Sequence, residues 1–249
     1  MEENNNLPSK ELPIKPLTRA ELAEDAKKRL SLIGTEFSRG FEFLKNYPKS
    51  VTFFGSARLD KEDPYCKKAE SLAGHIVKEL NYSIVTGGGP GIMEAANKGA
   101  HEMGGTAVGL NIKLPKEQRV NSYVTDSINF YYFFVRKVCL SFSAEAYVFF
   151  PGGFGTLDEM FEILTLVQTK KIEKVPIILV GKEYWEPLEQ FLKEKVLETK
   201  MIEEEDLTLY TITDNEDEII EIIRKSPIQE GVPYGSHHRK NKGNFFFFD

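Results

Sequence analysis

The sequence predicts an α/β fold of the Rossmann-like, doubly wound type, in which a parallel sheet carries helices on both faces, plus an N-terminal helical extension. Two observations support this prediction. Short apolar runs alternate with longer amphipathic segments between residues 50 and 225, which is typical of parallel strands joined by crossover helices. Three of the predicted strands also end in glycine-containing or turn-forming segments, and ligands bind such sheets beyond the carboxyl ends of the strands.

The elements follow from the spacing of apolar residues. The predicted strands are Val51–Phe54, Ser83–Thr86, Thr106–Asn111, Ala146–Phe150, Pro176–Val180 and a short strand near Leu207–Ile212. The predicted helices are Tyr65–Leu80, Gly91–Met103, Asn129–Ser143, Thr156–Lys170, Tyr184–Leu197 and Glu216–Arg224. Before them, apolar residues recur at helical spacing from Thr18 to Asn46, which predicts one or two further helices.

This order divides the chain into four predicted parts. A flexible polar tail (1–17) precedes the helical extension (18–48), a single Rossmann-like domain (49–226) follows, and a second tail (227–249) ends the chain. A length of 249 residues with 41% hydrophobic content suits one large α/β domain with a substantial core.

Composition excludes several classes of protein. A formal net charge of -6 does not favour binding to nucleic acid. No apolar run is long enough for a membrane helix. The two cysteines, Cys66 and Cys139, fall in separate predicted helices, and no apolar leader is evident at the start of the chain, so we expect a cytoplasmic protein. The four histidines lack the spacing of metal ligands, so no metal is expected.

The segment Pro151-Gly-Gly-Phe-Gly-Thr-Leu-Asp-Glu159 joins an apolar strand directly to the start of a helix. Glycines let the backbone approach a bound group closely, and the first N–H groups of a helix, with its positive dipole end, favour an anion. The segment therefore predicts a phosphate-binding turn. Its candidate contacts are Gly152, Gly153, Gly155 and Thr156.

Two carboxylates follow this turn. Glu159 is spaced to reach a sugar attached to the bound phosphate, which indicates chemistry as well as binding. Alternatively, Thr156 and Glu159 form a capping box, in which Glu159 binds only amides of its own helix. Asp158 also suits the helix dipole, so spacing alone does not decide which carboxylate faces the ligand.

Two other strand ends are expected to meet this turn in one pocket. Residues 87–94 read Gly-Gly-Gly-Pro-Gly-Ile-Met-Glu, and Gly55-Ser56 follow the first strand. Neither the dinucleotide pattern G-x-G-x-x-G nor a Walker A loop is present, which argues against a dehydrogenase or an NTPase. The alternative is that these turns serve only close packing. The added candidates for binding phosphate or ribose are Gly87, Gly88, Gly89, Gly91, Glu94, Gly55 and Ser56.

Arg136 interrupts an apolar stretch that runs from Tyr131 to Leu140. It shares the inward face of the predicted helix, and a buried guanidinium needs a partner. The candidates are Glu159, a ligand phosphate or both, and the alternative is an arginine that extends to the surface. Lys137 is predicted to be a solvated lysine or a helper in substrate binding.

Together these motifs resemble the LOG ("lonely guy") family, once labelled possible lysine decarboxylases. The resemblance covers roughly residues 51–197 and rests on residues 87–94, Arg136-Lys137 and residues 151–159. It implies a nucleotide-binding catalytic domain that hydrolyses the N-glycosidic bond of a nucleoside 5'-monophosphate, either AMP or a cytokinin ribotide, to free base and ribose 5-phosphate. By position it assigns catalysis to Glu159 and Arg136 and requires no cofactor.

The resemblance also implies a small-molecule nucleotide substrate and a homodimer or higher homo-oligomer. A pyridoxal phosphate decarboxylase is discounted, because it needs a Schiff-base lysine and neither glycine cluster contains one. Two rivals remain. One is a non-catalytic nucleotide-binding sensor or carrier that uses the same pocket, and the other is an interaction protein that docks through its N-terminal helices. Glu159 favours the hydrolase, since a pure binder has little need for a carboxylate beside the sugar.

Overall fold

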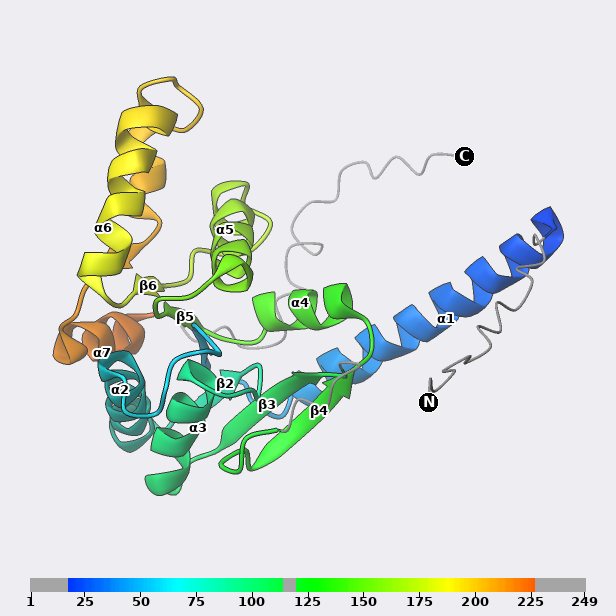
Figure 1. Ribbon diagram of the computed structural model, residues 1–249, viewed down its shortest axis with the longest axis horizontal. Coiled ribbons are helices and arrows are strands. Elements are labelled where there is room, and N and C mark those ends of the chain that lie inside the picture. Colours follow the sequence, from blue (N-terminus) through cyan, green and yellow to red (C-terminus); the bar gives the residue numbers. More distant parts are fainter. Residues whose placement is uncertain (1–17, 114–119, 227–249) are drawn as a thin grey trace, which may run out of the picture.

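Seven parallel strands form one sheet in the part of the chain described by the computed structural model, residues 18–113 and 120–226 (Figure 1). The strands are β1 (Ser50–Phe54), β2 (Ser83–Thr86), β3 (Ala107–Ile112), β4 (Asp126–Phe130), β5 (Ala146–Phe149), β6 (Ile177–Leu179) and β7 (Thr211–Ile212). Their order across the sheet is β4-β3-β2-β1-β5-β6-β7. The doubly wound α/β prediction is confirmed, while the predicted tails 1–17 and 227–249 lie outside the described residues.

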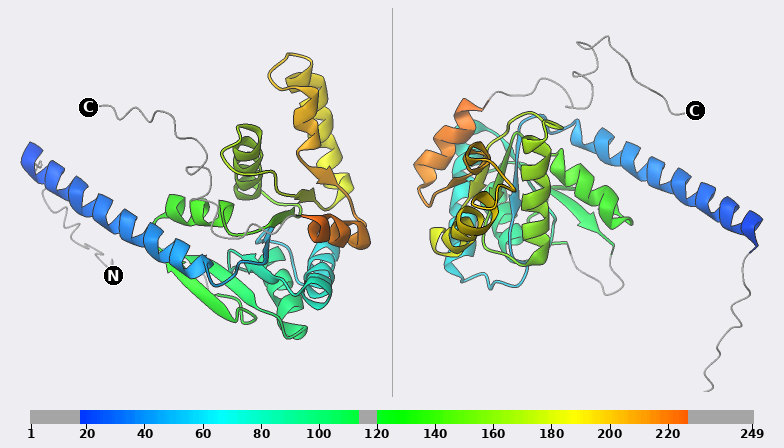
Figure 2. Two further views of the ribbon diagram at one scale, coloured as in Figure 1. Left: turned by 180° about the vertical axis from the view of Figure 1, so that it is seen from behind. Right: turned by 90° about the horizontal axis from the view of Figure 1, so that it is seen from above.

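Helices cover both faces of the sheet (Figures 1 and 2). One face packs against α2 (Pro64–Leu80), α3 (Ile92–Glu102) and α7 (Glu216–Lys225), and the other against α1 (Arg19–Leu44), α4 (Phe133–Ser141), α5 (Phe154–Gln168) and α6 (Lys182–Phe191). Successive strand residues point to opposite faces. Phe53 therefore belongs to one hydrophobic cluster and its neighbour Phe54 to the other.

The sequence prediction was wrong at the edge of the sheet. It placed a helix from Asn129 to Ser143, but β4 extends to Phe130 and α4 begins only at Phe133. β4 is an edge strand that pairs with β3, and within it only Ile128 and Phe130 are buried. Two buried positions followed directly by an aromatic run are too few to separate a strand from a helix by spacing.

Other boundaries differ less. The predicted helix Tyr184–Leu197 is α6 followed by a π-helical stretch, Leu192–Leu197. The predicted strand Leu207–Ile212 is a 3₁₀ turn (Glu204–Thr208) and the two-residue β7. The N-terminal extension is the single helix α1, whose first half projects away from the body (Figures 1 and 2).

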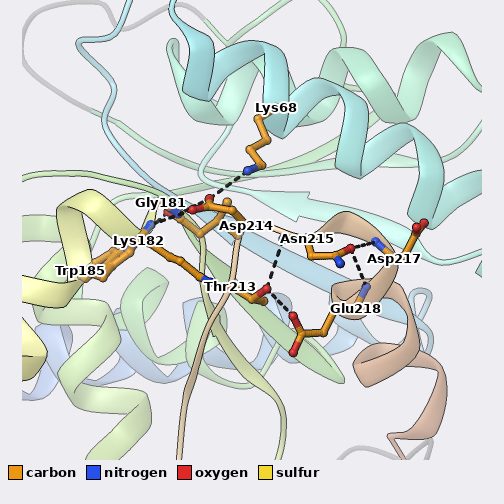
Figure 3. Close-up of polar contacts among 10 residues, drawn as sticks. Lys68, Gly181, Lys182, Trp185, Thr213, Asp214, Asn215, Asp217 and Glu218 are labelled. Carbon is orange, nitrogen blue, oxygen red and sulfur yellow. Dashed lines mark hydrogen bonds and ion pairs between the residues drawn. The ribbon is translucent and has the colours of Figure 1, made fainter.

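The end of β7 is tied to the start of α6 by Asp214 (Figure 3). Its Oδ1 accepts hydrogen bonds from the Gly181 N–H (2.9 Å) and Lys68 Nζ (2.9 Å), and its Oδ2 accepts one from the Lys182 N–H (3.0 Å). Burial acts to raise the pKa of Asp214, but these hydrogen bonds outweigh burial and lower it below its ordinary value. The chain's own side chains therefore close this junction.

Candidate active site

A cleft of about 860 Å³ opens beyond the carboxyl ends of β1, β2 and β5. The chain leaves β1 toward β2 and leaves β5 toward β6, in opposite directions, so the cleft lies at the topological switch point of the sheet. The three glycine segments and the arginine of α4 meet here. The sequence candidates that line the cleft are Gly55, Ser56, Gly87, Arg136, Gly152, Gly153, Gly155, Thr156, Asp158 and Glu159.

Backbone hydrogen bonds hold the three glycine segments together. The Ser56 N–H donates to the Pro151 carbonyl (3.0 Å), and the Ser56 carbonyl accepts from the Ile92 N–H (3.1 Å). Gly91 makes the second contact sterically feasible. Its φ is +68°, and a Cβ there would lie 2.3 Å from the Ser56 carbonyl oxygen. The floor of the cleft is thus fixed without any bound molecule.

The start of α5 is left uncapped. Gly153 is its N-cap, and no side chain of the described residues makes a capping hydrogen bond there. Thr156 therefore lies inside the first turn, which overturns the capping-box hypothesis for Glu159. A Cβ at Gly152 would come within 2.1 Å of Thr156 Oγ1, whereas a Cβ at Gly153 or Gly155 would meet nothing within 4 Å. The first N–H groups of α5 lack a side-chain cap among the described residues, and uncapped N–H groups at a helix N-terminus suit an anion.

Glu159 is a buried carboxylate on the wall of this cleft. It is 7% exposed, and its Oε2 has no hydrogen-bond partner among the described residues. Burial raises the pKa of Glu159 to about 8, with Glu162 adding to the shift and Lys137 and Arg136 opposing it. An unpaired buried oxygen costs stability, so this side chain is suited to contact a ligand rather than to support the fold.

Arg136 neither extends to the surface nor forms an ion pair within 4.0 Å in the described part of the chain. Its Nε donates to the Leu110 carbonyl (2.7 Å) and its Nη2 to the Gly87 carbonyl (3.3 Å), at the ends of β3 and β2. Burial lowers the pKa of Arg136, and the charge of Glu159 opposes that shift. Hydrogen bonds to two backbone carbonyls therefore fix the position of the guanidinium, which lines the cleft.

Lys137 is not the solvated lysine that the sequence allowed. Its ammonium group pairs with Asp158 and with Glu162 Oε2 (3.1 Å), and the lysine side chain is 19% exposed. Asp158 is thus occupied by an ion pair, whereas Glu159 on the next position has an unpaired oxygen. This contrast favours Glu159 over Asp158 as the carboxylate available to a ligand, although both line the cleft.

Other predicted contacts lie away from the cleft surface. Gly88 and Gly89 are buried behind it, where the Gly88 N–H donates to Thr86 Oγ1 and the Gly89 carbonyl accepts from Asn121. Gly91 and Glu94 line a second groove of about 800 Å³ beside α2 and α3. Gly88, Gly89 and Gly91 therefore serve the packing of the glycine turn, whereas Glu94 lines the second groove.

The cleft is also lined by nine residues outside the predicted set: Phe54, Ala57, Arg58, Met93, Phe133, Leu140, Phe154, Leu157 and Tyr184. The Tyr184 hydroxyl donates to the Gly152 carbonyl (2.5 Å), which fastens the phosphate-binding turn to α6. No sequence signal marks this tyrosine, because the contact depends on β5 and β6 being neighbours in the sheet.

Residues 18–113 and 120–226 contain neither a metal-binding cluster nor a membrane-spanning helix. No group of three histidine, cysteine, aspartate or glutamate side chains there is placed to hold a metal ion. No helix in the same ranges combines the length and apolar character needed to cross a membrane.

Comparison with known proteins places the chain in a family. A family model described as "Possible lysine decarboxylase" matches residues 93–223, a little more than half of the chain. The chain belongs to this family. The chain is similar to a cytokinin riboside 5'-monophosphate phosphoribohydrolase of Rhodococcoides fascians, which is 27% identical over 61% of this chain and 77% of its own length. The family resemblance drawn from the motifs is therefore confirmed.

A second similar sequence and one solved structure extend this comparison. The Arabidopsis thaliana cytokinin riboside 5'-monophosphate phosphoribohydrolase LOG5 is 24% identical over 77% of this chain and 84% of its own length. Among solved structures, the molybdenum cofactor carrier protein of Chlamydomonas reinhardtii superposes with a TM-score of 0.52 at 20% identity, covering 72% of this chain and 97% of the other. The second likeness concerns the fold.

Proposed function

We propose that the cleft binds a nucleoside 5'-monophosphate and that the protein hydrolyses its N-glycosidic bond. Water adds a hydroxyl group to the anomeric carbon, and the base leaves with the bonding electrons and a proton. The products are free base and ribose 5-phosphate. The named activity of the two phosphoribohydrolase relatives supports this proposal.

One observation carries the proposal: a buried carboxylate with an unpaired oxygen stands one turn beyond an uncapped helix N-terminus. The uncapped amides suit the 5'-phosphate. A ribose attached to that phosphate then lies beside Glu159. Bond cleavage develops positive charge on the sugar, so Glu159 in its ionised form stabilises the transition state more than the ground state. Because the pKa of Glu159 in the free protein is about 8, base release is expected to rise as pH approaches and passes 8. The 5'-phosphate serves as a handle that positions the anomeric carbon.

Arg136 has a binding role in this proposal. A guanidinium does not give up its proton at ordinary pH, so it is unsuited to general acid catalysis. Its Nε–H and one N–H of Nη2 donate to backbone carbonyls, which leaves the second N–H of Nη2 and both N–H groups of Nη1 for the phosphate or for the free oxygen of Glu159. Either contact orients the nucleotide.

The rival function is a non-catalytic nucleotide sensor or carrier, and the fold shared with a molybdenum cofactor carrier keeps it in consideration. The decarboxylase named in the family description finds less support, because no lysine is among the residues described as lining the cleft. Oligomeric state, cytoplasmic location and the choice between AMP and a cytokinin ribotide stay predictions.

The decisive experiment is chromatographic detection of free base. Wild-type protein is incubated with AMP, isopentenyladenosine monophosphate and adenosine, beside Glu159→Gln, Arg136→Ala and Asp158→Asn. Base released from a monophosphate but not from adenosine, lost in the first two variants and retained in Asp158→Asn, supports the hydrolase. Binding of a monophosphate without base release overturns it in favour of the sensor.

A further inference from the structure

A side chain of the N-terminal extension caps the helix that carries Arg136. Glu36 of α1 accepts hydrogen bonds from the backbone N–H groups of Tyr131 (Oε1, 2.7 Å) and Tyr132 (Oε2, 2.9 Å). Tyr132 is the N-cap of α4, whose own N-cap side chain makes no capping bond. A carboxylate here satisfies two N–H groups and meets the positive end of the helix dipole. α4 thus takes its cap from a distant helix.

Two further contacts hold α1 in this place. At Gly40 the helices approach so closely that a Cβ would lie 2.6 Å from Cys139 Sγ of α4 and 3.0 Å from the Phe130 ring of β4. Just beyond α1, the Tyr47 hydroxyl bonds to Asp126 at the start of β4. Figures 1 and 2 show the second half of α1 beside α4 and β4, while its first half projects beyond them. The capping contact is therefore part of a packed interface.

A short chain of bonds links Glu36 to the cleft. The N–H of Tyr132 donates to Glu36, and the carbonyl of the same residue accepts from the Arg136 N–H (3.2 Å). From that turn the Arg136 side chain reaches the Leu110 and Gly87 carbonyls. A shift of the first turn of α4 would draw the guanidinium away from these two acceptors.

We propose that Glu36 is a positioning residue for Arg136, so that α1 is a working part of the nucleotide site. α1 lies before residues 93–223, the range that matches the family model, so this role falls outside that match. The inference rests on the proposed function where it concerns substrate, but the hold of Glu36 on α4 is measurable without any substrate.

The test compares Glu36→Gln with Glu42→Gln. Glu42 lies on the same helix, is exposed, and pairs only with Lys45 among the described residues. Amide hydrogen exchange of residues 131–141 measures the cap, with exchange of α5 as an internal reference. Calorimetric affinity for AMP and isopentenyladenosine monophosphate, and kcat and KM for base release, measure the effect on the site.

We expect exchange at the start of α4 to quicken about tenfold in Glu36→Gln, because two hydrogen bonds to a charged acceptor are weakened. Nucleotide affinity should fall about tenfold and KM rise correspondingly, while kcat changes less. Glu42→Gln should match wild type. A merely structural loss would reduce the active fraction and hence kcat, and leave KM unchanged. Gly40→Ala, which forces the helices apart, should repeat the rise in KM.

Four outcomes decide between these roles. Unchanged exchange at residues 131–141 in Glu36→Gln overturns the capping role. Faster exchange with wild-type affinity and KM overturns the link to Arg136. A wild-type protein that binds a monophosphate without releasing base overturns the hydrolase alone, and the affinity of Glu36→Gln then still decides the link. A wild type that binds neither monophosphate removes both the proposed function and the link to it, and exchange then decides only the cap.

Discussion

Two helices begin at the same edge of the sheet, one after β5 and one after β6, and the chain treats their first turns in opposite ways. At the start of α6 the N–H groups of Gly181 and Lys182 donate to Asp214, whose charge is further balanced by Lys68 (Figure 3). At the start of α5 no side chain of the described residues supplies a capping oxygen. One helix N-terminus is filled by the protein's own carboxylate, and the other is left for an external anion.

The comparison shows how to recognise a binding turn within one fold. Both turns follow parallel strands and both contain glycine, so strand position and glycine content do not separate them. The separating features are an internal acceptor at α6 and a buried carboxylate with an unpaired oxygen, Glu159, beside α5. The unpaired oxygen of Glu159 lowers the stability of the protein beside α5, where we propose that a ligand binds.

The largest loss of nucleotide affinity is expected when α5 is given a capping carboxylate of its own. In Gly153→Asp the new side chain has room, since a Cβ there meets nothing within 4 Å, and it is placed to accept the first N–H groups of α5. We expect nucleotide affinity to fall about 100-fold, because the new charge repels phosphate and occupies its donors. Calorimetric titration with AMP and isopentenyladenosine monophosphate measures this.

The matched control is Gly153→Asn, which offers a cap of the same size without charge. It should weaken binding less than Gly153→Asp does, and both variants should raise the free energy of unfolding by about 0.3 kcal/mol, since glycine is itself an acceptable N-cap. Equal affinity in wild type and Gly153→Asp would place the phosphate elsewhere.

A second test exchanges one glycine of the cleft, Gly87 after β2, and one glycine of the closed α6 turn, Gly181, for alanine. In Gly87→Ala the new Cβ would lie 2.1 Å from Arg136 Nη2, so we expect kcat/KM for base release to fall about 10- to 50-fold. In Gly181→Ala the strain falls on the fold, because Gly181 has a φ of +105°. The second variant should lose stability and keep its kcat/KM. The reverse pattern would contradict the assignment of the two turns.

Because burial raises the pKa of the Glu159 carboxyl, we expect the stability of the protein to depend on pH. Its pKa in the folded state is about 8, above the ordinary value of 4.5, so the folded protein binds the extra proton between these values. The stabilisation linked to that proton is complete below about pH 4.5 and is lost as pH rises through about 8. Relative to Glu159→Gln, we expect wild type to lose about 2 kcal/mol of unfolding free energy between pH 5.5 and 8.

Denaturant titrations of both proteins across this range measure the difference. Groups near Glu159, namely Lys137, Glu162, Asp158 and Arg136, are present in both proteins, so their own titration largely cancels. A difference that stays flat with pH would show that Glu159 is already ionised in the folded state.

The smallest effect is expected at the closed turn. Asp214→Asn removes a charge that accepts three hydrogen bonds, and we expect a loss of about 1 kcal/mol in the free energy of unfolding. Nucleotide affinity should be unchanged, because the residue is not among those lining the cleft. Thermal unfolding and calorimetry on the same preparation test both expectations, and a loss of affinity would mean that the two turns are coupled.

Much of the fold was predictable because its signals are local. Buried parallel strands appear as short apolar runs, and α2 is marked by Asp63 as N-cap and Pro64 at its first position. The start of α4 could not be found this way. Its cap comes from Glu36, 95 residues before Tyr131, so the sequence around Tyr132 carries no start signal.

In the candidate site, too, the residues with local sequence signals could be predicted and their long-range partners could not. Glycine turns and an arginine in an apolar helix are visible in sequence, and they converge in the cleft. The partners of these residues are not visible. Lys137 finds two carboxylates on α5, and Tyr184 finds the Gly152 carbonyl, only after the strand order has brought their elements together.

The anchoring of Arg136 has a consequence for transferring this site to another scaffold. Both of its fixed acceptors are main-chain carbonyls, which every amino acid supplies, so any side chain that the core accommodates at the buried Leu110 position keeps the anchor. Coupled substitutions in an alignment would therefore reveal no partner for Arg136 at that position. A designer grafting the site needs two adjacent strand ends, a glycine at one of them and a helix crossing above, rather than a particular set of neighbouring side chains.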